Sequence, residues 1–295
     1  MTADATARDV GEFGLIARVI ERLAGSPSVL IGPGDDAAVV AAPDGRVVAT
    51  TDVLVEGVHF RRDWSSAYDV GRKAAAANLA DIAAMGARGT ALLVGLAAPA
   101  DLPLQWSLEL TDGLRDEAAL VGAAVVGGDV VRSTALVISV TALGDLEGRA
   151  PVTRGGAQPG DVVVLAGELG RSAAGLELLT AGTTEGELVD AHRRPAPPYE
   201  LGPVLALAGA TAMCDVSDGL VADLGHIAEM SAVHIDLAAG DRHFLTGGED
   251  HALVATLPAD VTLPDGVRVI GRVLQGAPAV TVEGQPATGG WDHFG

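Results

Sequence analysis

Short runs of β-branched residues alternate with alanine-rich, helix-patterned stretches along both halves of the chain. Strand patterns occur in VVATTDVLV, ALLVGLAA and DVVVLAG, and apolar residues recur at helical spacing over residues 12–23. Residues 67–85 are rich in alanine and are followed by Gly86 as a helix stop, and residues 103–121 are also predicted to form a helix. Alternation of this kind builds helices packed on sheets. Because no single strand–helix–strand period runs throughout, we predict an α/β (α+β) protein of two domains.

The segment EGRAPVTRGGAQPGD, residues 147–161, separates the two halves. It is dense in glycine, proline and polar side chains, which interrupt helices and strands alike and are typical of a linker. We therefore predict an N-terminal domain over residues 1–148 and a C-terminal domain over residues 149–295.

The composition limits both the core and the partners. Hydrophobic residues make up 48% of the chain but aromatic residues only 3%, so alanine, valine and leucine have to fill the core. The net charge is −20, from 39 acidic against 19 basic residues, which argues against a nucleic-acid or anionic-membrane surface. Metal ions and cationic ligands are the natural counter-charges.

Two single residues exclude further classes. Lys73 is the only lysine and lacks the glycine spacing of a Walker A loop, and Cys214 is the only cysteine, which excludes disulfide frameworks and zinc ribbons. The N-terminal residues show neither the cationic start nor the apolar core of a signal peptide, and no apolar stretch is long enough to span a bilayer. We expect a cytoplasmic protein without a membrane segment.

Aspartates recur at the ends of the predicted elements, in motifs such as IGPGDDAAVV and NLADIAAMGA. Each has a structural explanation, such as an Asx turn, or a helix N-cap formed by Ser217 or Asp218. Asp129 is predicted to follow a turn at Gly127–Gly128. One shared cause accounts for the whole set more simply. The acids are Asp35, Asp36, Asp52, Asp81, Asp129, Asp215 and Asp218.

Carboxylates gathered in a desolvated pocket repel one another and become protonated unless a cation lies between them. Hard oxygen ligands without a His/Cys set favour Mg²⁺ over zinc, and Mg²⁺ held by a few carboxylates usually carries substrate phosphates as well. The acids therefore predict phosphoryl transfer, in which the protein positions the reactants and metal ions neutralise charge.

Other polar residues remain open between a functional and a structural role. Arg154 either contacts a nucleotide phosphate or closes the linker, and Asn78 is either a metal ligand or a buried hydrogen-bonding group. His59 is more simply structural, and Lys73, two turns before Asp81, is either a partner of that acid or a helix-surface charge. The glycine-rich turn GELGRSAAG is a weak phosphate signal. GGEDHA lacks the aromatic residue that follows the signature of diguanylate cyclases, and its acid suits a cationic substrate.

A series of motifs, in order along the chain, resembles the thiamine-monophosphate kinase family. They are GEFGLIARV, IGPGDDAAVV, TTDVLVEGVHF, NLADIAAMGA, VGGDVVR, VTRGGAQPGD, SAAGLELL, CDVSDGLVADLGHI, TGGED and WDHFG, and they extend from Gly11 to Gly295. The wider superfamily includes aminoimidazole-ribonucleotide synthetase and selenophosphate synthetase. The resemblance implies two α/β domains, with the N-terminal sheets of two subunits forming a β-barrel in a homodimer.

The same resemblance assigns roles to individual residues. Ligands to several Mg²⁺ ions would be Asp36, Thr50, Thr51, Asp52, Asp81, Asp129, Asp215 and Asp218. Contacts to ATP would be Gly128, Asp129, Arg154 and Ser217. Contacts to thiamine phosphate would be His59, Glu249 and Trp291. An acid and an indole face suit a cationic thiazolium and a flat pyrimidine.

The implied reaction is direct in-line transfer of the γ-phosphoryl group of ATP to thiamine monophosphate, giving thiamine diphosphate and ADP, the last step of thiamine diphosphate biosynthesis. Because the acceptor phosphate is already ionised, no covalent nucleophile is expected. The alternatives are another phosphotransferase of the superfamily, such as a selenophosphate synthetase, and a non-catalytic nucleotide- or metal-binding relative. The chain departs from the family in a short segment before TGGED and in His251 and Ala252, where tyrosine and glutamate are common.

Overall fold

The computed structural model describes residues 6–32 and 38–291. The chain divides into two compact units. Unit 1 is Met1–Ile82 with Gly89–Glu147, and unit 2 is Ala83–Arg88 with Gly148–Gly295. The division after Glu147 falls in the glycine- and proline-rich segment, whereas the assignment of residues 83–88 to unit 2 has no counterpart in the sequence prediction.

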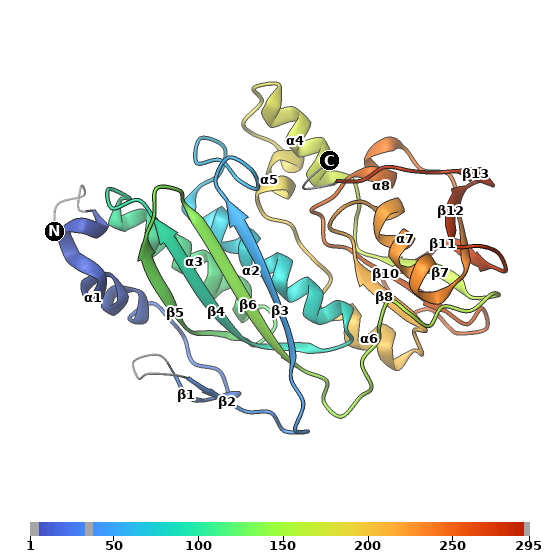
Figure 1. Ribbon diagram of the computed structural model, residues 1–295, viewed down its shortest axis with the longest axis horizontal. Coiled ribbons are helices and arrows are strands. Elements are labelled where there is room, and N and C mark those ends of the chain that lie inside the picture. The colour runs from blue at the N-terminus through green and yellow to red at the C-terminus, as the bar shows by residue number, and fades with distance from the viewer. Residues whose placement is uncertain (1–5, 33–37, 292–295) are drawn as a thin grey trace. The chain divides into compact units, whose positions relative to one another are not determined.

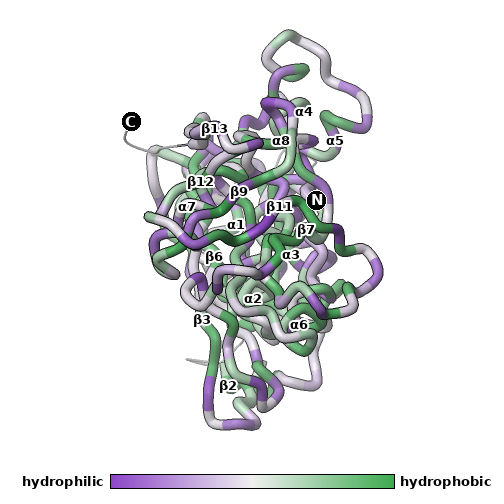
Figure 2. Tube along the Cα trace, turned by 90° about the vertical axis from the view of Figure 1, so that its right-hand side faces the viewer, coloured by the Kyte–Doolittle hydropathy of each residue, from purple (hydrophilic) through white to green (hydrophobic). Residues whose placement is uncertain are grey.

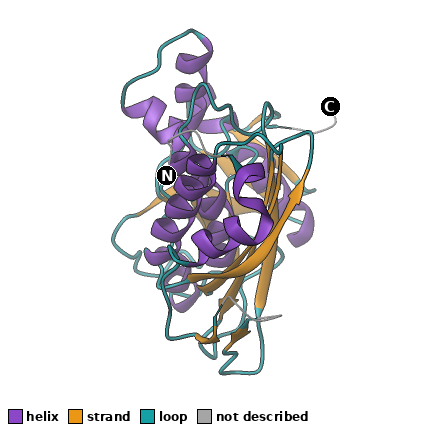
Figure 3. Ribbon diagram, turned by 90° about the vertical axis from the view of Figure 1, so that its left-hand side faces the viewer, coloured by secondary structure: helices purple, strands orange, loops and turns teal. Residues whose placement is uncertain are grey.

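Unit 1 contains a four-stranded sheet, a short hairpin and three helices. Its elements are α1 Ala7–Ile20, β1 Val29–Ile31, β2 Val39–Val40, β3 Val48–Val55, α2 Ala67–Ala84, β4 Arg88–Ala98, α3 Leu104–Ala119, β5 Ala124–Arg132 and β6 Val137–Asp145. The sheet order is β3-β6-β4-β5, in which β3 and β6 pair antiparallel and β4 and β5 pair parallel. Helices α2 and α3 cover one face of this sheet (Figures 1 and 3).

Helices α2 and α3 cross in backbone contact. A Cβ atom on Gly71 would lie 2.2 Å from the carbonyl oxygen of Leu110, and one on Gly113 would lie 2.1 Å from that of Tyr68. Both distances are far shorter than a van der Waals contact, so only glycine fits at these positions. The small residues of the sequence therefore set how closely the two helices approach.

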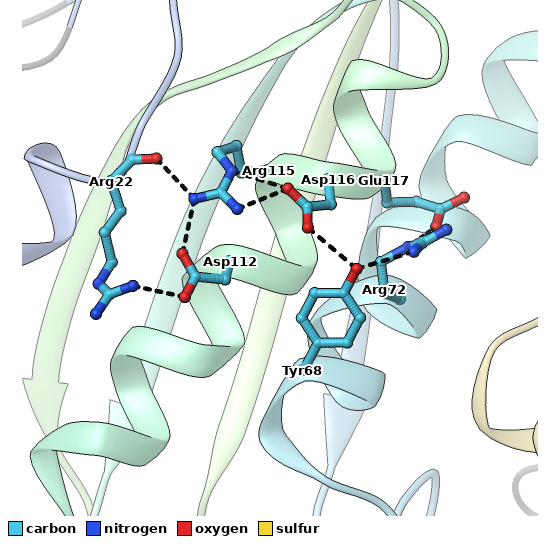
Figure 4. A network of polar contacts seen from close by, with 7 residues as sticks. All are labelled: Arg22, Tyr68, Arg72, Asp112, Arg115, Asp116 and Glu117. Atoms are coloured by element: carbon cyan, nitrogen blue, oxygen red, sulfur yellow. Dashed lines mark hydrogen bonds and ion pairs between the residues drawn. The ribbon is translucent and has the colours of Figure 1, made fainter.

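A network of charged side chains lies beside this crossing (Figure 4). Glu117 on α3 is only 1% exposed and forms an ion pair with Arg72 on α2. A buried carboxylate needs such a partner, because an uncompensated buried charge is strongly destabilising. The network continues through hydrogen bonds from Tyr68 to Asp116 (3.0 Å), from Arg115 to Asp112 (2.7 Å) and from Arg22 to Asp112 (2.6 Å).

Unit 2 contains a seven-stranded sheet with helices on both faces. Its elements are β7 Val162–Ala166, α4 Arg171–Thr180, α5 Glu187–Arg193, α6 Leu201–Leu207, β8 Ala212–Asp215, α7 Leu220–Ser231, β9 His234–Leu237, α8 Arg242–Thr246, β10 Leu253–Leu257, β11 Val267–Leu274, β12 Ala279–Val282 and β13 Gln285–Pro286. The sheet order is β13-β12-β9-β11-β7-β10-β8. Neighbouring strands pair antiparallel except β9 and β12, which are parallel.

The central strands of this sheet are buried on both faces. Every residue of β10 is buried, and so is every residue of β7 except the first, Val162. One face packs against α7 around Leu224 and Ile227, and the other packs against α6 around Leu205. Two-sided burial explains why VVVLA and LVATL are nearly continuous hydrophobic runs rather than alternating ones. Figure 2 shows how hydrophobic stretches, in green, and hydrophilic stretches, in purple, alternate along the chain.

Most of the long predicted elements are present. Helices α2 and α3 confirm the helices predicted over residues 67–85 and 103–121, and α1 begins five residues before the predicted residue 12. No helix within the described ranges is long and apolar enough to cross a membrane.

The predicted turn at Gly127–Gly128 is wrong, because β5 continues through both glycines to Arg132. A Cβ atom on Gly128 would lie 1.9 Å from the carbonyl oxygen of Val94 on the paired strand β4. Glycine is therefore required here for the close approach of two strands and not for a turn.

Candidate functional site

Strand β3 and helix α2 bring three of the predicted metal ligands together. Thr50 Oγ1 donates a hydrogen bond of 2.6 Å to Oδ2 of Asp81 on α2. Asp52 lies two residues after Thr50 on the same strand, so both side chains leave the face that is turned toward this helix. All three side chains are half-buried. Two partly desolvated carboxylates beside a hydroxyl form a donor set that suits a hard divalent cation.

Asn78 holds the strand to the helix at this point. It is fully buried, its Oδ1 accepts from the backbone N–H of Asp52 at 3.0 Å, and its Nδ2 donates to the carbonyl oxygen of Ala74 at 3.0 Å. Of the two roles left open for Asn78, the geometry supports the buried hydrogen-bonding group.

Thr51 and Asp129 lie on the other face of the sheet. Thr51 Oγ1 donates to the carbonyl oxygen of Val140 at 3.0 Å, and the exposed Asp129 pairs with Gly95 on β4. Strands β3 and β5 are the two edges of the sheet, so Asp129 is three strand spacings, about 14 Å, from the Thr51 strand. Unit 1 therefore gathers Thr50, Asp52 and Asp81 but not Thr51 or Asp129. Asp36 lies outside the described residues.

His59 follows β3 in a turn with a defined orientation. Its Nδ1 atom accepts from the backbone N–H of Val55 at 3.1 Å, so a neutral His59 ring carries its hydrogen on Nε2. Lys73 Nζ donates to the carbonyl oxygen of His59 at 3.3 Å and its side chain is buried. The helix-surface role considered for Lys73 is therefore wrong.

In unit 2, a buried carboxylate organises the turn between β8 and α7. Asp223, one turn into α7, accepts from the backbone N–H groups of Ser217, Asp218 and Gly219, each at 3.1 Å. The N-cap of α7 is Gly219, and neither Ser217 nor Asp218 caps the helix with its side chain, so that structural explanation is wrong. Asp223 thereby holds the turn that carries Asp215 and Asp218.

The donor atoms of this turn fit a hard cation. Burial, and after it the negative charges of Asp215 and Asp218, raise the pKa of Asp223 to about 7. A divalent cation relieves such repulsion, and oxygen donors without a thiolate favour Mg²⁺. Among residues 6–32 and 38–291, no group of three or more His, Cys, Asp or Glu side chains is already arranged around a metal position. A cation held at this turn would therefore need phosphate oxygens or further residues to complete its coordination.

This repulsion predicts a pH dependence of stability in metal-free protein. The folded chain keeps a proton on Asp223 between pH 3.8 and about 7 that the unfolded chain releases. The free energy of unfolding should therefore fall as pH rises through this window, by about 4 kcal/mol. Asp223→Asn should flatten that slope in denaturation series in EDTA, whereas Asp260→Asn, at an exposed position, should keep it. An unchanged slope in Asp223→Asn would contradict the predicted titration.

The GGED loop reaches back to the same turn. Glu249 has a left-handed backbone (φ 63°), and its N–H donates to the carbonyl oxygen of Ser217 at 2.9 Å. Its Oε2 atom lies 3.6 Å from Nδ1 of the buried His192 on α5. A strained, non-glycine conformation of this kind is maintained only where the surroundings fix it. Glu249, which is predicted to contact the substrate, and the Ser217 turn are therefore parts of one hydrogen-bonded assembly.

Asp250 occupies the amides of the glycine-rich turn. It is buried and accepts from the backbone N–H groups of Gly170 at 2.7 Å and Ser172 at 2.8 Å. Because these two amides already have a carboxylate partner, the turn GELGRSAAG is held by the protein itself, which weakens its interpretation as a phosphate cradle.

The C-terminal segment and the linker also meet α7. The N–H of Trp291 donates to the carbonyl oxygen of Asp218 at 2.8 Å, and the Trp291 side chain is 60% exposed. Ser231, at the end of α7, donates to the carbonyl oxygen of Arg154 at 3.3 Å, while the Arg154 side chain is exposed. Predicted metal, substrate and nucleotide residues of unit 2 thus lie around the two ends of one helix.

Three residues that support the site were not assigned roles from the sequence, namely Asp223, Asp250 and His192. A usable signal existed only for Asp223, an acid on the otherwise apolar face of LVADLGHI. The partners of the other two lie 20 or more residues away, so no local pattern identifies them.

Two protein-family models match the chain: AIR synthase related protein, N-terminal domain, over residues 34–146, and AIR synthase related protein, C-terminal domain, over residues 158–256. A thiamine-monophosphate kinase of Mycobacterium tuberculosis (strain ATCC 25618 / H37Rv) is 51% identical over an alignment of 317 positions. The alignment covers 100% of this chain and 95% of the relative.

Solved structures agree with these matches. The thiamine-monophosphate kinase from Stenotrophomonas maltophilia K279a has a TM-score of 0.78 and 34% identity, covering 92% of this chain and 95% of its own. AaThiL complexed with AMPPCP and TMP has a TM-score of 0.79 and 34% identity, covering 97% and 98%. The predicted two-domain α/β fold of this superfamily is thereby confirmed, and the chain belongs to the thiamine-monophosphate kinase family.

Proposed function

We propose that the protein phosphorylates thiamine monophosphate with ATP, giving thiamine diphosphate and ADP, the last step of thiamine diphosphate biosynthesis. The observation that carries this proposal is the grouping of Thr50, Asp52 and Asp81 in a chain that shares 51% identity with a thiamine-monophosphate kinase. The only thiol, Cys214, is 3% exposed, which disfavours a thiol-dependent reaction such as that of a selenophosphate synthetase. We expect the enzyme to act in the cytoplasm, with small-molecule partners and no nucleic acid.

Mg²⁺ is part of the proposal. The predicted ligands are Asp36, Thr50, Thr51, Asp52, Asp81, Asp129, Asp215 and Asp218. When bound, Mg²⁺ would neutralise the phosphate oxygens and align the triphosphate with the acceptor. The protein's own contribution is to fix the ligand orientations: Thr50 holds Asp81, and Asp223 holds the turn of Asp215 and Asp218.

Substrate contacts follow from the chemistry of the three predicted residues. His59 presents an Nε2–H donor, which suits an anionic phosphate. The Glu249 carboxylate suits the cationic thiazolium, and the exposed indole of Trp291 suits a flat aromatic ring. The predicted ATP contacts are Gly128, Asp129, Arg154 and Ser217. Since the acceptor oxygen is ionised at neutral pH, positioning and charge neutralisation supply the catalysis without a covalent nucleophile.

A homodimer with a shared β-barrel completes the proposal. Thr51 and Asp129 lie on the same face of the sheet, opposite the helices and at opposite edges, β3 and β5. A second copy that sets its β5 beside β3 would bring its Asp129 to Thr51 of the first. This arrangement accounts for two predicted ligands of one site lying about 14 Å apart in a single copy.

The proposed function is tested by product formation. Purified protein is incubated with ATP, Mg²⁺ and thiamine monophosphate, and thiamine diphosphate and ADP are quantified by chromatography. Controls are thiamine in place of its phosphate and a sample with EDTA. Stoichiometric, EDTA-sensitive formation of both products is expected. Stabilisation by ATP and metal without product would indicate a binding-competent relative with another acceptor.

Trp291→Ala tests the substrate assignment. Loss of the stacked indole should raise the KM for thiamine monophosphate by about tenfold, with little change in the KM for ATP. The backbone bond from residue 291 to Asp218 is kept, so the segment should stay in place. Trp64→Ala, which removes an indole stacked on Arg61, is the control and should change neither KM. Equal changes in both KM values would argue against stacking by Trp291.

A further inference from the structure

His251 adopts a conformation that the surrounding structure imposes. It follows the GGED acids, has a left-handed backbone (φ 54°) and is 7% exposed. Its backbone N–H donates to the carbonyl oxygen of Val216 at 3.1 Å. A side chain other than glycine is strained in this region, so the surrounding contacts have to hold this conformation.

The left-handed backbone of His251 places its imidazole ring beside Asp215. His251 Nδ1 lies 3.0 Å from Asp215 Oδ2, and Asp215 is 4% exposed. An ionised carboxylate only accepts hydrogen bonds, so the hydrogen of this bond belongs to Nδ1 of His251. Asp215 is the last residue of β8, and its backbone is held in register with Leu253 of β10. With the backbone held, the bond from His251 sets the direction of the carboxylate.

We infer that His251 is a positioning residue for Asp215: it holds Oδ2 and so fixes the orientation in which the carboxylate would be offered to a cation. The inference rests on the proposed function, in which Asp215 is a metal ligand. Partners of this kind orient ligating carboxylates and set metal affinity.

Mn²⁺ binding to the complete protein at one fixed pH tests the inference without using turnover. Mn²⁺ alone is titrated and the free ion is followed by electron paramagnetic resonance. His251→Phe removes the donor but keeps a ring, and it should weaken Mn²⁺ binding by about tenfold. His251→Asn, whose amide can donate and which tolerates a left-handed backbone, should recover part of the loss. His234→Phe is the matched control, because His234 in the same unit bonds Thr281 and not Asp215.

Asp215→Asn separates the inference from the proposed function. Weaker Mn²⁺ binding in Asp215→Asn with unchanged binding in His251→Phe would overturn the role of His251 and leave Asp215 as a ligand. Unchanged binding in Asp215→Asn would overturn both assignments, while the product assay judges the reaction itself. If His251→Phe fails to fold, ¹⁵N shifts of the wild-type histidines give the answer. A hydrogen on Nδ1 of His251 is expected, and a hydrogen only on Nε2 would overturn the inference.

Discussion

Asp52→Asn and Asp129→Asn should each lower turnover of thiamine monophosphate by about 10²- to 10³-fold while leaving the fold intact. Asparagine keeps the size of the side chain but lacks the charge that a divalent cation requires. The backbone of Asp52 is held by Asn78 and by pairing with β6, and Asp129 is exposed, so neither change should disturb folding. Product chromatography measures turnover, and thermal melting with circular dichroism checks the fold.

Asp63→Asn is the matched control for both variants. Asp63 is an exposed acid of unit 1 that pairs with Arg61, and it has no role in the proposed site. It should keep the wild-type rate. A wild-type rate in Asp52→Asn or Asp129→Asn would remove that residue from the predicted metal ligands.

Mixing the two inactive variants should restore activity if Asp129 acts on a second copy. In a dimer that contains one copy of each variant, one site has lost both acids and the other keeps both. Random exchange of subunits makes half of the dimers mixed, and one of the two sites in each mixed dimer is intact. About one quarter of all sites are then intact, so about one quarter of the wild-type rate is expected. No recovery after exchange, with dimers verified by light scattering, would show that Asp52 and Asp129 do not meet across copies.

Gly71→Ala should destabilise the protein by about 3 kcal/mol. The added Cβ atom would lie 2.2 Å from the carbonyl oxygen of Leu110, and the nearest atoms belong to the α3 backbone and cannot rotate away. The helices have to separate, which opens the packing beneath the sheet and beside the ion pair of Arg72 with Glu117. Chemical denaturation measures the loss, and Gly113→Ala should behave in the same way.

Gly225→Ala supplies the control for this substitution. Gly225 lies within α7, and a Cβ atom there would meet nothing within 4 Å. Alanine should therefore stabilise the helix by about 0.5–1 kcal/mol through the lower conformational entropy of the unfolded chain. Equal losses in Gly71→Ala and Gly225→Ala would mean that the close crossing of α2 and α3 does not limit stability.

The local pattern of residue types was sufficient for the long helices. An alanine-rich stretch that ends before Gly86 predicted α2, and the helix predicted over residues 103–121 matches α3, because helix formation and termination depend on neighbouring residues. It was not sufficient for Gly127–Gly128, where the reason for glycine is the carbonyl oxygen of Val94 on another strand. Helices α5 and α6 were not predicted, and each is only seven residues long.

The candidate site, too, was predicted only in part from the sequence. The recurring acids were visible in the sequence as residue types that suit Mg²⁺, and their order matched a family. Only the structure shows that Lys73 is buried against the turn of His59. It also shows that Asp129 lies on the edge strand β5, whereas Asp52 lies on the other edge strand, β3. Sequence position alone does not say on which face or edge of a sheet a residue will lie.

By itself the sequence determined which residue types this protein contains and which family it resembles. It provides small residues for close packing, carboxylates that suit a cation, and motifs that identify the family. Only the tertiary structure decided which carboxylates are available to a ligand. Asp223 and Asp250 are acids like the others, but each is buried against backbone N–H groups, and Asp215 is fixed by His251. The physical reason is that a hydrogen bond depends on distance and direction between segments far apart in the chain, and only folding sets these.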